Sequence, residues 1–439
     1  MDLLCNAYCN ASDNEEAEAE GIKETVTPPN PKRLKPDNPF AHTKFHHPLP
    51  ESTQFPTTQA EAPVPGRYIS KRERALLATQ PTVPEPNPNP NAPVTTLPVF
   101  GSISDSDVRR DVMSLLRNKG KKGPSQLGQL PQRTSVALNR HTKAVNAVHW
   151  SPTHAHLLAS ASMDHTICIW NVWSSDEKVA RVLNFHSAAV KDVKWSQQGL
   201  SVLSCGYDSS SRLVDVEKGL EIQVFKEDQV VSVIKFHPDN SNLFISGGSK
   251  GGIRLWDVRS GKVVHEYIRG HDPILDLEFS TNSKQIISSS DVSGRNLSEN
   301  SIVVWDVSRQ VPLSNQVYVE AFTCPCVRSH PFEPFFVAQS NGNYIAIFSL
   351  SPPFKLNKYK RYESHGVSGF PIKCVFSLDG EKLVSGSSDG SLYFYDYRSS
   401  ELVRKIKAYE QACIDVAIHP VMPNVIASCS WNGEVSVFE

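Results

Sequence analysis

From about residue 134 onward, the chain consists of short runs of alternating apolar and polar residues, separated by turns rich in glycine, aspartate, asparagine and serine. One example is ASASMDHTICIWNV, residues 159–172, in which small residues precede an acidic turn and an alternating stretch that includes Trp170. Alternation over roughly four to eight residues is typical of half-buried β-strands, and the intervening residue types favour tight turns. The pattern therefore predicts an all-β fold for residues 134–439.

The same unit recurs seven times. Its aromatic position, or the residue that replaces it, falls at residues 170, 214, 256, 305, 348, 395 and 438, so successive units are 42 to 49 residues apart. Blades of WD-type β-propellers repeat at roughly 40–45 residues and contain four strands each. The repeat therefore predicts a seven-bladed WD40-type β-propeller. The seventh unit ends after its third strand, and we expect residues 134–138 to supply the fourth strand and close the ring.

Each repeat carries polar residue types that also serve in catalysis, but the repeat context favours a structural role. In the first repeat, His141, a serine at position 160 or 162, Asp164 and Trp170 are placed to form one buried chain of hydrogen bonds. We expect the corresponding residues of other repeats to act in the same way, namely His186, Asp208, Trp256, His271, Trp305, His365 and Asp389.

Some repeats depart from this pattern. Lys250 and Gly342 occupy the position that Asp164 holds in the first repeat, so we expect an incomplete buried network in the third and fifth blades, which must then depend more on packing. The fourth repeat is lengthened by VSGRNLSE, residues 292–299. This elongated turn either serves a function or reflects ordinary drift.

The region before the repeats has a different composition. Residues 1–131 contain 19 of the 31 prolines, including the run PTVPEPNPNPNAPVTTLP. A segment of this kind cannot bury enough apolar surface to offset the entropy lost on ordering. We therefore predict two parts, a largely disordered proline-rich arm over residues 1–133 and the propeller over residues 134–439.

Two stretches of the arm favour short helices, residues 68–79 and residues 105–119. In the second, Val108, Val112, Leu115 and Leu116 share one helical stripe, serine and aspartate precede it, and basic residues follow it. Such a stripe indicates either a recognition helix that folds on a partner or a transient helix in a linker. The sequence alone leaves both alternatives open.

Charge and composition exclude several classes of function. The formal net charge is -1, so the chain lacks the basic excess of a strong nucleic-acid binder, and we expect no direct RNA binding. No apolar stretch is long enough for a membrane helix, and the acidic N-terminus lacks the pattern of a signal peptide. The nine cysteines are scattered, which favours buried thiols in a reducing compartment.

Neither a catalytic centre nor a cofactor is expected. Cys324 and Cys326 have the spacing of half a metal site, but no second pair of cysteine or histidine residues stands at a suitable distance, so we expect no metal. The glycine-rich stretch SGGSKGG, residues 246–252, lies between predicted strands rather than before a helix, so it does not fit a phosphate-binding loop. We therefore expect a protein that is not an enzyme.

Several phrases outside the repeat consensus narrow the family. The chain resembles the propeller of the pre-mRNA-processing factor seventeen family in four stretches. These are RHTKAVNAVHWSPTHAHLLASASMDHTICIW, NLFISGGSKGGIRLWDVRSGKVVHEY, FKLNKYKRYESHGVSGF and AYEQACIDVAIHP. This resemblance implies a non-enzymatic protein-interaction scaffold in nuclear ribonucleoprotein assemblies, acting around the second catalytic step of splicing. Its partners would be proteins of a multi-subunit nuclear complex. A short basic cluster, Lys32, Arg33 and Lys35, fits a nuclear-import signal.

An alternative function is that of a substrate receptor in a cullin-type ubiquitin ligase. Many such receptors end a repeat with the pattern WDxR, which residues 256–259 match. An exposed Arg259 would then donate bidentate hydrogen bonds to an adaptor. The fuller pattern requires an aspartate where Lys250 stands, so the match is incomplete. Arg259 is otherwise an exposed residue at the corner of a blade.

Overall fold

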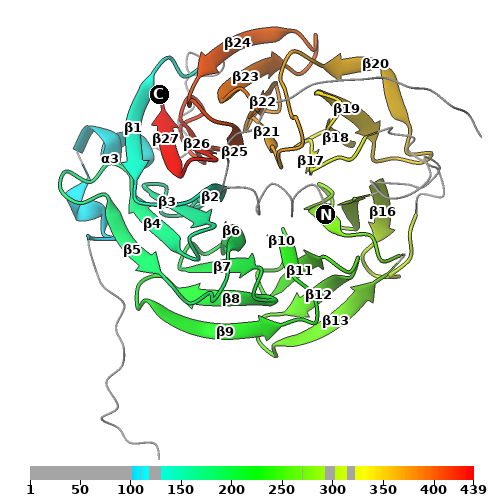
Figure 1. Ribbon diagram of the computed structural model, residues 1–439, viewed down its shortest axis with the longest axis horizontal. Coiled ribbons are helices and arrows are strands. Elements are labelled where there is room, and N and C mark those ends of the chain that lie inside the picture. The colour runs from blue at the N-terminus through cyan, green and yellow to red at the C-terminus, as the bar shows by residue number, and fades with distance from the viewer. Residues whose placement is uncertain (1–100, 109, 118–129, 269, 292–301, 314–321) are drawn as a thin grey trace, which may run out of the picture. The chain divides into compact units, whose positions relative to one another are not determined.

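The computed structural model describes residues 101–108, 110–117, 130–268, 270–291, 302–313 and 322–439 (Figure 1). The expectations for the helix at 68–79, for the basic cluster at 32–35 and for the insertion at 292–299 lie outside these residues. The described part of the chain consists mainly of strands, because its short alternating runs bury one or both faces of each strand between neighbouring sheets.

Seven antiparallel sheets are arranged around a ring, so the predicted seven-bladed propeller is confirmed (Figure 1). The first blade contains β2 (Val145–Trp150), β3 (Leu157–Ser162), β4 (Ile167–Asn171) and β5 (Val179–Leu183). The second contains β6 (Val190–Trp195), β7 (Ser201–Gly206), β8 (Ser210–Asp215) and β9 (Leu220–Lys226). The third contains β10 (Val231–Phe236), β11 (Leu243–Gly248), β12 (Ile253–Asp257) and β13 (Lys262–Tyr267).

The remaining blades continue the ring in chain order. The described strands of the fourth blade are β14 (Ile274–Phe279), β15 (Gln285–Ser290) and β16 (Ile302–Asp306). The fifth contains β17 (Cys326–Ser329), β18 (Phe335–Ser340), β19 (Tyr344–Ser349) and β20 (Leu356–Tyr362). The sixth contains β21 (Cys374–Phe376), β22 (Lys382–Ser385), β23 (Ser391–Asp396) and β24 (Leu402–Lys407).

The seventh blade closes the ring with strands from both ends of the propeller. Its sheet order is β1 (Thr134–Asn139), β27 (Glu434–Phe438), β26 (Ile426–Ser430) and β25 (Cys413–Ile418). β1 pairs antiparallel with β27, with Leu138 opposite Val435, so the predicted closure by residues 134–138 is confirmed. Figure 1 shows the two strands side by side next to the C-terminus. Pairing across this seam covers two strand edges that would otherwise be exposed.

The hydrophobic core lies between the blades rather than inside any one of them. The described residues form seven apolar clusters, each built mainly from two adjacent sheets. Between the second and third blades, for example, Phe225 packs edge-to-face against Phe244 with ring centroids 4.8 Å apart, and Trp256 stacks on Phe244. Full burial of one such side chain contributes about 1.5–3 kcal/mol, so neighbouring blades stabilise each other.

Residues 101–108 and 110–117, here called the strap, lie against the first blade and the closing strand β1 (Figure 1). They contain the short 3-10 helix η1 (Asp105–Asp107), whose N-cap is Ser104, and helix α3 (Arg110–Arg117). Val112 and Leu116 are buried in the cluster that joins the seventh and first blades. The helical stripe read from the sequence therefore packs on the chain's own propeller, which was neither of the two alternatives considered for it.

Side chains of the first blade hold the backbone of the strap. Asn171 Nδ2 donates to the carbonyl oxygens of Ser102 and Ser104, at 3.1 and 3.2 Å. Arg181 Nη1 donates to the carbonyl oxygen of Gly101 at 3.1 Å. Each of these hydrogen bonds satisfies a carbonyl group of an extended segment, which fixes its register on the blade.

Candidate functional site

The first blade contains the complete network that the sequence predicts. His141 Nδ1 lies 2.9 Å from Asp164 Oδ2, and His141 Nε2 lies 2.8 Å from Ser160 Oγ. Trp170 Nε1 donates to the same serine oxygen at 2.8 Å. Burial would raise the pKa of Asp164, but hydrogen bonds from His141, Thr166 and a backbone N–H together hold it well below its ordinary value. These hydrogen bonds join residues of a single repeat, in the arrangement that the sequence predicts.

The second blade repeats this arrangement without a tryptophan. His186 Nδ1 lies 3.0 Å from Asp208 Oδ2, and its Nε2 lies 2.8 Å from Ser204 Oγ. Val214, at the tryptophan position, is buried in the core instead. The histidine–aspartate pair therefore forms independently of the indole donor.

The prediction of an incomplete network in the third blade is wrong. Glu227 stands at the histidine position, and its Oε1 accepts a hydrogen bond from Ser246 Oγ at 2.6 Å. Ser246 in turn accepts the indole N–H of Trp256 at 2.9 Å, and Arg254 Nη1 lies 3.0 Å from Glu227 Oε2. The acidic group has moved to the histidine position and is paired with an arginine, while Lys250 lies exposed beside Asp228. The sequence analysis considered only the aspartate position in this repeat and therefore did not identify Glu227 as the acidic residue of the network.

Predicted network residues in two other blades also need correction. In the fourth blade Trp305 Nε1 donates to Ser288 Oγ at 2.9 Å as expected, but His271 is exposed and takes no part in that bond. The serine–tryptophan bond of this blade therefore forms without the histidine.

In the sixth blade, His365 and Asp389 do not bond to each other. His365 Nδ1 lies 2.8 Å from the hydroxyl of Tyr395, and burial lowers the pKa of this histidine to about 4. Asp389 accepts from the Tyr393 hydroxyl at 3.0 Å and pairs with Lys405 at 2.8 Å. Tyr395 stands at the tryptophan position and Tyr393 two residues before it, and the two hydroxyls give His365 and Asp389 different hydrogen-bond partners.

The central channel holds a second set of buried polar groups, which the sequence analysis did not identify. Asp192, Asp276 and Asp415 occupy equivalent positions on β6, β14 and β25, and all three are buried. Each carboxylate accepts a backbone N–H from the inner strand of the following blade, with distances of 3.4, 2.9 and 3.2 Å respectively. The aspartates therefore tie neighbouring blades together. Their signal in the sequence is the aspartate shared by VKDVKW, ILDLEF and CIDVAI.

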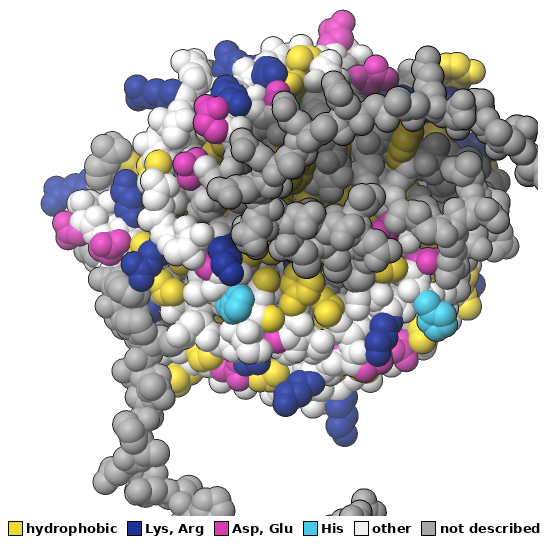
Figure 2. Space-filling view, viewed as in Figure 1, with side chains coloured by type: hydrophobic (Ala, Val, Ile, Leu, Met, Phe, Trp, Pro, Cys, Tyr) yellow, Lys and Arg dark blue, Asp and Glu magenta, His cyan; other side chains and the backbone are white. Residues whose placement is uncertain are grey.

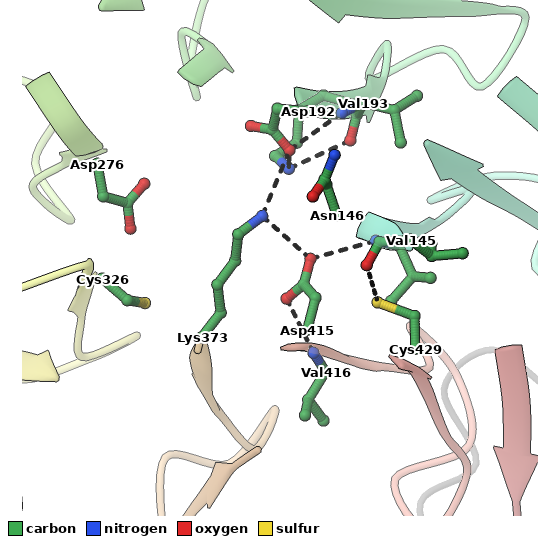
Figure 3. Close-up of polar contacts among 12 residues, drawn as sticks. Val145, Asn146, Asp192, Val193, Asp276, Cys326, Lys373, Asp415, Val416 and Cys429 are labelled. Atoms are coloured by element: carbon green, nitrogen blue, oxygen red, sulfur yellow. Dashed lines mark hydrogen bonds and ion pairs between the residues drawn. The ribbon is translucent and has the colours of Figure 1, made fainter. Parts of the chain in front are cut away.

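Basic side chains neutralise these aspartates. Lys373 points between Asp415 and Asp192, with Nζ–Oδ distances of 3.3 and 3.7 Å (Figure 3). Burial would lower the pKa of Lys373, but the two aspartates raise it above its ordinary value. Arg328 pairs with Asp276 at 2.5 Å in the same way. The channel charges are thus committed to one another, which favours a structural function over an open anion site.

The structure also shows where the residues of the alternative function and of the candidate metal site lie. The side chain of Arg259 is 74% exposed, and its Nε lies 3.6 Å from Asp257 Oδ1, so it is a surface residue with a partner inside the chain. Cys326 Sγ lies 3.9 Å from Cys374 Sγ of the next blade. No group of three or more potential metal ligands occurs among the described residues. Nor does that part of the chain contain a helix long and apolar enough to cross a membrane.

Comparison with known proteins also identifies WD repeats in this chain. The model of the WD domain, G-beta repeat, matches residues 132–171, 177–215, 219–257, 261–306 and 357–396. WD repeat-containing protein 25 of Mus musculus is 36% identical over 311 residues, which are 70% of this chain and 58% of that protein. Pre-mRNA-processing factor 17 of Mus musculus and of Homo sapiens are 32% and 31% identical over 318 residues, 72% of this chain and 54% of each protein.

These matches confirm the resemblance inferred from the sequence phrases. The chain spans between half and three fifths of the length of the relatives it matches.

Proposed function

Since the chain contains WD repeats and folds as a seven-bladed propeller, we propose that it is a non-enzymatic scaffold that binds proteins of assemblies related to pre-mRNA splicing. The observation that carries this proposal is the similarity to pre-mRNA-processing factor 17 at 31–32% identity over 318 residues. The relatives extend beyond the matched region, so the inference concerns what the propeller contributes rather than everything the relatives do.

The geometry of the propeller suits recognition. Its blades are fixed by apolar clusters and by the aspartates of the channel, so surface loops are held in place before a partner arrives. A preformed surface loses little conformational entropy on binding, which leaves more of the contact energy for affinity. Rigid loops on a propeller are therefore suited to holding several proteins in a defined arrangement.

Charge supports proteins rather than RNA as the direct partners. Figure 2 shows basic and acidic side chains interspersed over the visible face of the described residues, without a continuous basic region. The formal net charge of the whole chain is -1. Strong binding to a phosphate backbone requires an excess of lysine and arginine, so contact with RNA would be made through protein partners.

A nuclear location is part of the proposal. The cluster Lys32, Arg33 and Lys35 supplies the import signal. Replacing all three with alanine in the tagged full chain should shift the protein from the nucleus to the cytoplasm, as seen by fluorescence microscopy. An unchanged distribution would remove this cluster from the proposal.

The scaffold proposal is tested by affinity purification of the tagged full chain from nuclear extract, followed by mass spectrometry. Splicing proteins should be recovered, and they should remain after treatment with ribonuclease because the contacts are between proteins. Absence of splicing proteins, or their loss after ribonuclease, would contradict the proposal. Recovery of a cullin adaptor without splicing proteins would assign the propeller to substrate recruitment instead.

A further inference from the structure

A cavity of about 980 Å³ lies between the strap and the first two blades. We propose that this cavity, here called the strap pocket, binds a short peptide of a partner protein that carries arginine or lysine next to an aliphatic residue. This inference rests on the proposed scaffold function, because it supplies one of the surfaces that a scaffold needs. The volume is within the range of sites that enclose small ligands or a few peptide residues.

The pocket has an apolar wall. Met113 and Leu116 line it from helix α3, and Leu157, Leu200 and Val216 line it from the first and second blades. Leu200 is 52% exposed, although removing a leucine side chain from water is energetically favourable. An aliphatic side chain of a bound peptide would cover this residue.

The rim of the pocket is acidic. Asp176, Glu177 and Glu217 are exposed carboxylates that line it, and Asp105 of the strap is a fourth. Among the described residues that line the pocket, Arg181 is the only lysine or arginine. Its Nη1 already donates to the carbonyl oxygens of Gly101 and Ala180, so it supports the strap. The rim therefore attracts a cationic group.

The negative charge of the rim determines which class of partner the pocket can bind. Four carboxylates repel the phosphates of a nucleic acid, so RNA does not fit this surface. A metal ion does not fit either, because no metal-binding group of three or more side chains occurs among the described residues. A peptide with a guanidinium or ammonium group beside an aliphatic side chain satisfies both the rim and the wall.

The floor of the pocket is held rigidly where the first two blades meet. Thr153 Oγ1 donates to the carbonyl oxygen of Gln198 at 2.8 Å, and His154 Nδ1 lies 3.2 Å from the carbonyl oxygen of Gly199. Gly199 has a φ of +69°, and a Cβ at this residue would lie 1.9 Å from Thr153 Oγ1, so the two loops meet more closely than other residues would allow. A preformed floor lowers the entropy cost of binding.

The test is a selection of random octapeptides displayed on phage against the immobilised full chain. Enriched peptides should place arginine or lysine next to leucine, isoleucine or methionine. The most enriched peptide, made synthetically, should bind the double variant Asp176→Asn, Glu217→Gln about fivefold more weakly than the wild type, as loss of two partly solvated charge pairs implies. Its affinity should also fall as salt is raised.

The matched control is the double variant Glu410→Gln, Glu434→Gln, which removes two exposed carboxylates outside the pocket and should bind like the wild type. No enrichment, enrichment of peptides without basic residues, or equal affinity for the pocket variant would overturn the inference. The scaffold proposal is tested separately by purification from nuclear extract. Recovery of splicing proteins together with a failed peptide selection would therefore overturn the strap pocket alone.

Discussion

The ammonium nitrogen of Lys373 lies 3.3 Å from Oδ2 of Asp415, inside the central channel (Figure 3). Asp415 also accepts the backbone N–H of Val148 at 3.2 Å, so one carboxylate joins three inner strands of the ring. Lys373 extends this link across the channel to Asp192 of the second blade. The stability of the propeller therefore depends on charges at its centre as well as on the apolar clusters between blades.

Replacing Lys373 with methionine should destabilise the propeller by about 3–5 kcal/mol, because the buried Asp415 loses its cation while the volume is nearly kept. Asp192 loses its second cation and keeps Lys194, whose Nζ lies 2.5 Å from Oδ1. The free energy of unfolding from urea titration measures this effect. Lys355→Met, at an exposed position, is the matched control and should change stability by less than about 0.5 kcal/mol. Equal midpoints for the two variants would mean that the channel pairs do not support the ring.

Stability should fall as the pH is lowered from 6.5 toward 4. Burial lowers the pKa of His365 and of His419 to about 4, from an ordinary value of 6.5. In this window the unfolded chain binds protons that the folded chain does not, so the free energy of unfolding decreases with falling pH. The expected slope is up to about 1.4 kcal/mol per pH unit for each histidine.

His419 is the residue that tests this pH dependence most clearly. Its Nδ1 accepts N–H groups from Val421 and Met422 and its Nε2 donates to the carbonyl oxygen of Ala155, so a second proton has no acceptor. Urea midpoints at pH 7.5 and 5.0 should differ less for His419→Gln than for the wild type. A wild-type protein as stable at pH 5.0 as at pH 7.5 would refute the prediction.

The closing strand should be as important as any core strand. Leu138 is 1% exposed and packs in the cluster that joins the seventh and first blades. Leu138→Ala should therefore cost about 2–5 kcal/mol, measured as a lower thermal midpoint of the whole propeller. The neighbouring exposed Asn139→Ala should have little effect. If Leu138→Ala melts like the wild type, β1 does not hold the ring closed.

We expect that a substitution in helix α3 can release the strap while the blades stay folded. Val112 is 7% exposed, so Val112→Asp places a carboxylate in an apolar cluster and should release helix α3. Hydrogen exchange should then accelerate in residues 101–117 while strands of the third and fourth blades keep their protection. Arg110→Asp, at an exposed position of the same helix, should leave exchange unchanged. Acceleration throughout the propeller would show that the strap is part of its core.

Much of this architecture follows from local sequence. Alternation and the recurring turn residues predict the strands, and the spacing of aromatic positions predicts seven blades, because each blade repeats the same packing problem. The same reasoning predicted the closing strand β1. The network of the first blade was also foreseen, since His141, Asp164 and Trp170 lie within a single repeat.

Other features depend on contacts between distant residues. In the third blade Glu227 stands at the histidine position and pairs with Arg254 of β12, not with Lys250 at the aspartate position, which inspection of the aspartate position alone does not reveal. Helix α3 was expected from its stripe, but the surface that buries Val112 is assembled from the first and seventh blades, far apart in the chain. Lys373 likewise contacts Asp192 only because the folded ring brings distant parts of the chain together.

The most direct test of the central claim is a splicing reaction in nuclear extract from which this protein has been depleted, with the recombinant full chain added back. A scaffold of splicing assemblies should be required for normal kinetics. Depletion should therefore slow the formation of spliced RNA, and the added chain should restore it. Unchanged kinetics after depletion would contradict the proposed role in splicing.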